Sequence, residues 1–121
     1  MLSIKEEIDL HTEVVKFVRE KYPGAVMIPG LGEFQDTGEL RMKAWQKGYT
    51  SGQPDLLLIH PSECTHYVGI AIEFKHPWGK STTTEQQEAY LKKLRGMGVK
   101  TMVSHKFTDI VVALAHYFGE D

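Results

Sequence analysis

The most constraining feature of the sequence is a pair of apolar segments, residues 55–60 and 67–75, that flank the polar turn Pro61–Thr65. The first segment is apolar almost throughout, which is typical of a strand buried on both faces. The second alternates between large apolar residues and small or charged ones, which indicates a strand whose two faces differ. The short turn between the segments predicts an antiparallel β-hairpin.

The hairpin determines which polar residues face one another. If the turn is centred near Cys64, Asp55 lies directly opposite Glu73, and Lys75 shares their face two residues further on. Two carboxylates at this separation repel each other unless a cation lies between them, and oxygen ligands favour a hard ion such as Mg²⁺. A lysine beside such an ion is suited to position a water molecule or to stabilise phosphate charge. The pattern is therefore compatible with metal-assisted chemistry on a phosphate.

The neighbours of these residues leave two interpretations open. Gly69 and Ala71 are the small residues on the same face, and we expect them to leave space there for a substrate backbone. The alternative is an ordinary turn at Gly52–Asp55 that leads into a strand, with Glu73 and Lys75 on a solvated sheet face.

The rest of the chain shows alternating helical and strand patterns. Thr84 and Gln87 have the spacing of a helix capping box, and residues 31–53 are rich in glycine, which predicts a long loop or short irregular elements. The predicted helices are residues 4–22, 83–95 and 107–118, and the further strands are residues 25–28 and 101–104. We therefore expect one α/β domain over residues 1–121, with a mixed sheet flanked by helices in the order α-β-β-β-α-β-α.

Charge is distributed unevenly along the chain. The formal net charge is −2, so the whole sequence lacks the basic character that is typical of many nucleic-acid-binding proteins. Residues 74–106 nevertheless carry seven Lys and Arg against two Glu, a local charge of +5. This segment is suited to contact phosphates, although a solvated helix face with scattered lysines gives the same composition.

Cysteine usage and hydropathy indicate the cellular environment. The single cysteine, Cys64, excludes an intramolecular disulfide and suits a reducing compartment. The longest apolar runs fall far short of the ~20 residues that span a bilayer, and the acidic start does not resemble a signal peptide. We therefore expect a soluble, cytoplasmic protein with no membrane partner.

Four phrases of the sequence resemble the VRR-NUC domain, a branch of the PD-(D/E)XK nuclease superfamily. The resemblance spans roughly residues 29–106, with a weaker match in the first helix. The phrases are Gly52-Gln53-Pro54-Asp55-Leu56-Leu57-Leu58-Ile59, Gly69-Ile70-Ala71-Ile72-Glu73-Phe74-Lys75, Gly79-Lys80-Ser81, and the helical residues Gln87, Tyr90 and Leu91. The resemblance implies a restriction-endonuclease-like fold and hydrolysis of DNA phosphodiesters that depends on Mg²⁺ or Mn²⁺.

The resemblance also assigns roles to individual residues. Asp55 and Glu73 match the metal ligands, the Phe74 carbonyl matches a backbone ligand, and Lys75 matches the catalytic lysine. Gln87 matches a helical glutamine beside the site. Its alternative role is that of a helix cap residue.

The first helix is expected to contribute one more acidic residue. Glu7 shares a helical stripe with His11, Val14 and Val18, so we select it over the other candidates, Glu6, Asp9 and Glu13. The family often has Asn after a proline where this chain has Pro29-Gly30, which leaves any role of that loop open.

Further residues are candidates for DNA contact. Trp78 lies in a Pro-Trp-Gly loop beside Lys80, where its ring is suited to stack on a base or sugar. The alternative is that Trp78 is a packing residue. Lys92, Lys93 and Arg95 belong to the basic segment and are expected to contact phosphates.

Together these features predict a metal-dependent DNA endonuclease that selects branched or junction DNA. The alternative is a non-catalytic nucleic-acid-binding or regulatory domain with the same fold. Because nothing is fused to the domain, we expect a stand-alone form of viral or phage type. Its resemblance to dimeric stand-alone domains predicts a homodimer, paired through the otherwise unexplained apolar residues Leu31, Phe34, Leu40, Met42 and Trp45.

Overall fold

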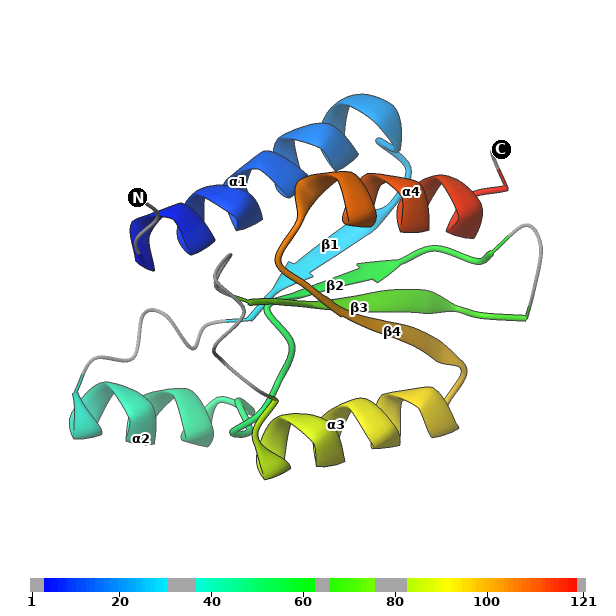
Figure 1. The fold of residues 1–121 in the computed structure, drawn as a ribbon. Helices are drawn as coiled ribbons and strands as arrows, with labels where there is room; N and C mark the ends of the chain where they lie inside the picture. Colours follow the sequence, from blue (N-terminus) through cyan, green and yellow to red (C-terminus); the bar gives the residue numbers. More distant parts are fainter. Residues whose placement is uncertain (1–3, 31–36, 63–65, 76–82, 120–121) are drawn as a thin grey trace.

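A four-stranded mixed sheet with helices on both faces forms the protein (Figure 1). The computed structural model describes residues 4–30, 37–62, 66–75 and 83–119. The elements in chain order are α1 (Ile4–Lys21), β1 (Val26–Pro29), α2 (Gly38–Gln46), β2 (Leu56–Ile59), β3 (Gly69–Phe74), α3 (Glu85–Gly96), β4 (Val99–Ser104) and α4 (Phe107–Tyr117). The strands lie side by side in sequence order, β1 to β4; β3 and β4 are parallel and the other neighbours antiparallel. The α/β class and the mixed sheet flanked by helices are confirmed.

The predicted hairpin and its register are confirmed. Strands β2 and β3 pair with Leu56 opposite Ile72 and Ile59 opposite Gly69. Asp55 precedes Leu56 and Glu73 follows Ile72, so in the same register Asp55 lies opposite Glu73. The polar pair therefore lies where β2 begins and β3 ends.

The main core lies between the sheet and the layer formed by α1 and α4 (Figure 1). Side chains of β2 and β3 that point to this face, such as Leu58 and Ile70, are fully buried against residues of α1 and α4 such as Val14 and Leu114. Burial of several such side chains, each worth about 1.5–3 kcal/mol, gives this face most of the stability of the fold. It also holds β2 and β3 in register.

The opposite face of β3 is covered by α3. Ala71 is fully buried in a smaller cluster with Leu91 of α3 and Val99 of β4. The expectation that Gly69 and Ala71 leave room for a substrate is therefore wrong. Ala71 packs against the helix, and a Cβ at Gly69 would overlap the Leu58 carbonyl of β2. All six residues of β3 are buried.

Strand β2 is buried mainly on one face, which corrects the expectation that both faces are buried. Leu56 and Leu58 are buried, whereas Leu57 is only partly covered and Ile59 is exposed. Ile59 pairs with Val26 of β1, which is also exposed, so the same face of both strands is open. The cause is the position of α3, which packs on β3 and β4 and reaches Leu57 of β2 but leaves Ile59 and Val26 uncovered.

Helix α2 lies within the segment predicted as a loop, so the order of elements is α-β-α-β-β-α-β-α. Thr37 caps it, since its Oγ1 accepts a hydrogen bond from the amide of Leu40 at 3.1 Å. Glu39 and Lys43 form an ion pair of 3.3 Å one turn apart on its surface. None of the residues of α2 is buried, so the helix does not pack an apolar side onto the core. A helix of this kind lacks the regular apolar spacing by which amphipathic helices are found in a sequence.

The other predicted elements are found within two residues of their expected ends. The Thr84–Gln87 capping box at the start of α3 is present with both of its hydrogen bonds. In the described part of the chain, no helix has the length and apolar character needed to cross a membrane.

Candidate active site

Two carboxyl groups and a lysine meet where β2 begins and β3 ends, on the face of the sheet that α3 covers. Glu73 and Lys75 are 5% and 9% exposed, which is unusual for charged side chains. Asp55 is held against β3, because its Oδ2 accepts a hydrogen bond of 2.9 Å from the amide of Phe74. This bond fixes the Asp55 carboxylate beside the main chain of Phe74, next to Glu73.

Gln87 joins this group from the first turn of α3. Its Nε2 donates to Glu73 Oε2 at 2.9 Å, and its Oε1 accepts from Lys75 Nζ at 3.0 Å. Lys75 Nζ also lies 3.8 Å from Glu73 Oε2. We name Asp55, Glu73, Lys75 and Gln87 the carboxylate–lysine cluster.

The same glutamine also caps α3. The main-chain amide of Gln87 donates a hydrogen bond to Thr84 Oγ1 at 3.1 Å. The side-chain Oε1 of Gln87 accepts one from the main-chain amide of Thr84 at 2.9 Å. The two roles considered for Gln87 are therefore geometrically compatible, since one Oε1 serves both Thr84 and Lys75. Any movement of Gln87 disturbs the helix start and the cluster together.

The environment of Glu73 changes its protonation. Burial, and next the negative charge of Asp55, raise the pKa of the Glu73 carboxyl from 4.5 to about 8, although the Lys75 ammonium acts in the opposite direction. At neutral pH and without a bound cation, Glu73 is therefore mostly protonated. The proton removes the repulsion that two adjacent carboxylates otherwise have.

The donor set of the cluster fits a hard divalent cation. Two adjacent carboxyl groups offer only oxygen atoms, and Mg²⁺ commonly binds one or two protein carboxylates while it keeps several waters. Within the described residues, no group of three or more His, Cys, Asp or Glu side chains is placed to hold a metal. The oxygen-only donors of Asp55 and Glu73 thus suit Mg²⁺ or Mn²⁺ better than a soft-ligand zinc site.

Two glycines bring the backbone close to this cluster. Gly52 has φ +94°, and a Cβ there would overlap the main chain of Gln86 at the start of α3. Gly30 donates its amide to the Asp55 carbonyl at 2.8 Å, and a Cβ there would overlap the Pro54 carbonyl. A glycine follows Pro29 because the Pro54-Asp55 main chain lies too close for a side chain at position 30. No sequence motif indicated this contact.

Tyr49 is a neighbour of the cluster that the sequence reasoning missed. Its side chain is partly buried, and its amide donates to the carbonyl of Ala44 at the end of α2 at 2.9 Å. Burial, followed by the charges of Asp55 and Glu73, raises the pKa of the Tyr49 hydroxyl. A lone tyrosine in a polar segment carries no sequence signal, because only the fold brings it near the carboxylates.

The remaining predicted site residues have different outcomes. Glu7 lies in α1, but its side chain is outside the described part of the structure. One turn later in α1, the His11 ring lies 4.8 Å from the Phe74 ring, so this part of the helix passes over the end of β3. Trp78 and Lys80 lie outside the described residues.

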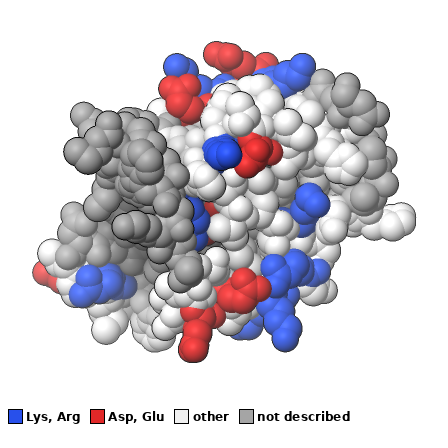
Figure 2. Space-filling model, in the orientation of Figure 1, with Lys and Arg blue, Asp and Glu red and all other residues white. Residues whose placement is uncertain are grey.

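The basic residues of α3 are not equivalent. Lys92 and Lys93 are exposed, and Figure 2 shows Lys and Arg side chains gathered over α3 beside acidic ones. Arg95 forms an ion pair of 2.8 Å with Glu88 and donates to Thr101 Oγ1 at 2.9 Å. Lys92 and Lys93 are thus better placed to contact phosphates than Arg95, whose guanidinium already has partners.

The protonation of Glu73 predicts how stability changes with pH. Between pH 4.5 and about 8 the unfolded chain loses the Glu73 proton while the folded protein retains it. This group therefore stabilises the fold fully at low pH, and its contribution falls as pH rises toward 8, by a few kcal/mol in total. We expect Glu73→Gln, which cannot ionise, to remove this decline.

Urea unfolding of both proteins in chelator from pH 5 to pH 8.5 measures the difference. The free energy of unfolding of Glu73→Gln should rise relative to that of the wild type as pH increases. Parallel profiles would contradict the raised pKa of Glu73.

Comparison with known proteins adds a structural relationship. The sequence matches no protein-family model and no curated protein sequence. A solved structure described as a VRR_NUC domain protein superposes on this one with a TM-score of 0.69. The match covers 94% of this chain and 90% of the other, at 21% sequence identity. Nearly the whole chain thus has the fold of a VRR-NUC domain, as the sequence resemblance implied.

Proposed function

We propose that this protein is a metal-dependent DNA endonuclease. The observation that carries the proposal is the carboxylate–lysine cluster, in which two adjacent carboxyl groups, a buried lysine and a bridging glutamine meet at the strand ends. Burying such groups costs stability unless they have partners, so a cluster of this kind is typical of a functional site. The VRR-NUC fold supports the nuclease assignment and DNA as the partner.

In this proposal each residue of the cluster has a defined role. Asp55, Glu73 and the Phe74 carbonyl hold Mg²⁺ or Mn²⁺, which when bound would activate water and neutralise charge on the phosphate. Lys75 carries a positive charge that Gln87 orients through the 3.0 Å hydrogen bond. This ammonium stabilises the negative charge that develops on the phosphate oxygens during attack. Glu7 of α1 completes the acidic set.

The proposed reaction is hydrolysis of a phosphodiester bond. A water oxygen attacks phosphorus, the bond between phosphorus and the 3′ oxygen breaks, and the products carry a 5′-phosphate and a 3′-hydroxyl. A non-catalytic nucleic-acid-binding domain is the competing function. The paired carboxyl groups argue against it, because the charge of Asp55 repels DNA phosphates and the pair gives binding no benefit without a cation.

Removing Glu73 should separate cleavage from binding. We expect Glu73→Ala to abolish cleavage while DNA affinity stays about equal, because the change removes a metal ligand whose side chain is mostly uncharged at neutral pH without a cation. Labelled duplex, flap, splayed-arm and four-way-junction DNA with Mg²⁺, Mn²⁺ or chelator provide the assay. They also test the preference for branched DNA.

The matched control is Glu20→Ala, which removes an exposed carboxylate of α1. It should cleave at the wild-type rate. Cleavage by Glu73→Ala at that rate, or cleavage by the wild type in chelator, would disprove the site. A wild-type protein that binds all four DNAs and cuts none would favour the non-catalytic function.

The exposed lysines of α3 should contribute to DNA affinity without sequence preference. Lys92→Ala/Lys93→Ala should weaken binding to all DNAs alike and reduce the slope of log affinity against log salt by about 1–2. Lys16→Ala/Arg19→Ala is the control, since it removes the same charge from exposed positions of α1, on the opposite side of the sheet (Figure 1). Equal slopes for the two double variants would refute a role for this helix face.

We also propose that the protein acts as a homodimer paired through α2. Several apolar side chains of α2 are exposed, and Trp45 is 66% exposed. In the described part of the chain, no residue of α2 is buried, so these apolar side chains are available to pack against another molecule. Light scattering after size exclusion should give twice the chain mass of 13.7 kDa. Trp45→Glu should shift the mass to that of the monomer, whereas Lys43→Glu on the same helix should not. A wild-type monomer at micromolar concentration, with and without DNA, would contradict the dimer alone.

A further inference from the structure

A hollow with polar and apolar lining residues lies beside the carboxylate–lysine cluster. It is enclosed by the end of β1 at Gly30, by the end of α2 at Lys47, and by Tyr49 and Gln53 of the following segment. Its volume of about 270 Å³ is close to the lower end of small-molecule pockets, about 300–1,000 Å³. The hollow therefore has room for one phosphate with its sugar. Base-paired DNA is too large for it.

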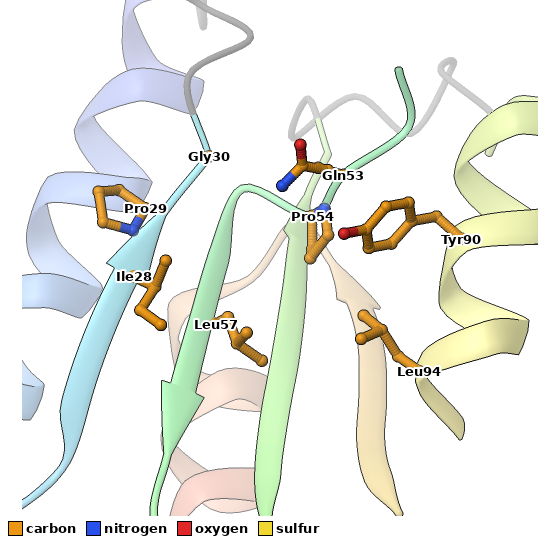
Figure 3. A pocket seen from close by; sticks show the side chains of 8 residues that line it. All are labelled: Ile28, Pro29, Gly30, Gln53, Pro54, Leu57, Tyr90 and Leu94. Atoms are coloured by element: carbon orange, nitrogen blue, oxygen red, sulfur yellow. The ribbon is translucent and has the colours of Figure 1, made fainter. Parts of the chain in front are cut away.

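A second, narrower groove shares Pro29, Gly30 and Gln53 with the hollow. Figure 3 shows Gln53 at one end of this groove, with Leu57 of β2 and Leu94 of α3 further along it. Its volume is about 50 Å³, which suits a few water molecules. The larger hollow is thus the better candidate for a ligand.

Three of the residues that line the hollow carry hydrogen-bond donors. Among the described residues, the Lys47 ammonium has no ion-pair partner and the Tyr49 hydroxyl has no hydrogen-bond partner. Gln53 Oε1 accepts a hydrogen bond from the main-chain amide of Thr50 at 2.5 Å. The other polar group of the Gln53 side chain is its NH₂, which is a donor. An ammonium, a hydroxyl and an amide N–H together favour an anion.

The neighbouring carboxyl groups show how close this hollow is to the cluster. Burial, and next the charge of Asp55, raise the pKa of the Tyr49 hydroxyl, so it is a hydrogen-bond donor at neutral pH. Gly30, in the wall of the hollow, is hydrogen-bonded to the main chain of Asp55 at 2.8 Å. A ligand in the hollow is therefore an immediate neighbour of whatever binds at Asp55.

We propose that the hollow binds the DNA phosphate next to the one that is cut, with Lys47 neutralising its charge and Tyr49 donating a hydrogen bond to it. The inference rests on the proposed nuclease function and adds a substrate subsite to it. Lys47 also offsets the repulsion that Asp55 exerts on an approaching strand. Neither residue touches the reacting atoms, so both are positioning residues.

Three variants test the subsite. Lys47→Ala removes the charge and Tyr49→Phe removes only the hydroxyl, while Lys43→Ala removes an equal charge from the same helix at a residue paired with Glu39. DNA affinity is measured by fluorescence anisotropy in Ca²⁺ at several salt concentrations. We expect Lys47→Ala to weaken binding about threefold to tenfold and to lower the salt slope by about 1. Tyr49→Phe should weaken it several-fold with the slope unchanged, and Lys43→Ala should stay within about twofold of the wild type.

A substrate series locates the phosphate. In the DNA that the wild type cuts at a defined position, single phosphates on either side of that position are replaced by uncharged methylphosphonates. The cleavage penalty of Lys47→Ala should disappear for one substituted phosphate adjacent to the cut and persist for the others, because the two changes remove the same contact. An equal penalty across the series, or a penalty no larger than that of Lys43→Ala, would overturn the subsite.

The outcomes distinguish this inference from the proposed function. Cleavage that depends on Glu73 but is indifferent to Lys47 and Tyr49 would refute the subsite and leave the nuclease intact. Binding that is weakened by Lys47→Ala and Tyr49→Phe, without cleavage by the wild type, would refute the nuclease and retain a DNA contact at the hollow. A wild type that neither binds nor cuts DNA would refute both.

Discussion

The proximity of two carboxyl groups is the constraint around which the other features of this site are arranged. Hairpin register places Asp55 opposite Glu73, and the burial that stabilises the sheet also takes the Glu73 carboxyl out of water. An isolated pair of this kind would destabilise the fold. Three local features make it tolerable: the Phe74 amide binds Asp55, Gln87 donates to Glu73, and the raised pKa keeps Glu73 mostly neutral at pH 7. A bound cation would replace the proton as the partner of the pair.

Gln87 links the stability of α3 to the geometry of the cluster. The side chain that completes the helix cap also orients Lys75, and the backbone just before it is in close contact with Gly52. The loop that leads to Asp55 and the helix that covers Glu73 are therefore packed directly on each other. Precise placement of four polar groups here depends on backbone contacts as well as on side chains, as is usual for sites that must be preorganised.

Sequence reasoning succeeds where a local rule determines the structure. The pairing of Asp55 with Glu73 followed from two apolar segments and one turn, and the role of Gln87 in the cap followed from its spacing to Thr84. The helix α2 was missed because it buries no residue and so has no apolar periodicity. The exposed face of β2 was also missed, since the sequence of a strand does not show how far a neighbouring helix extends over the sheet. Tyr49 and Lys47 approach the site only through the path of the chain after α2, which no motif encodes.

The origin of the four cluster residues has a consequence for folding. Asp55 immediately precedes β2, Glu73 and Lys75 belong to β3 and the residues after it, and Gln87 belongs to α3, so three separate segments must dock before the cluster exists. The β2–β3 pairing is local in sequence, whereas α3 is positioned only when the parallel β3–β4 pairing forms across the intervening helix. The β2–β3 hairpin alone would hold the two carboxyl groups without Gln87 and without cover from α3, so the pKa of Glu73 would lie nearer its usual value. The assembled cluster is therefore a property of the completely folded chain, and the raised pKa of Glu73 would report whether α3 is docked on β3.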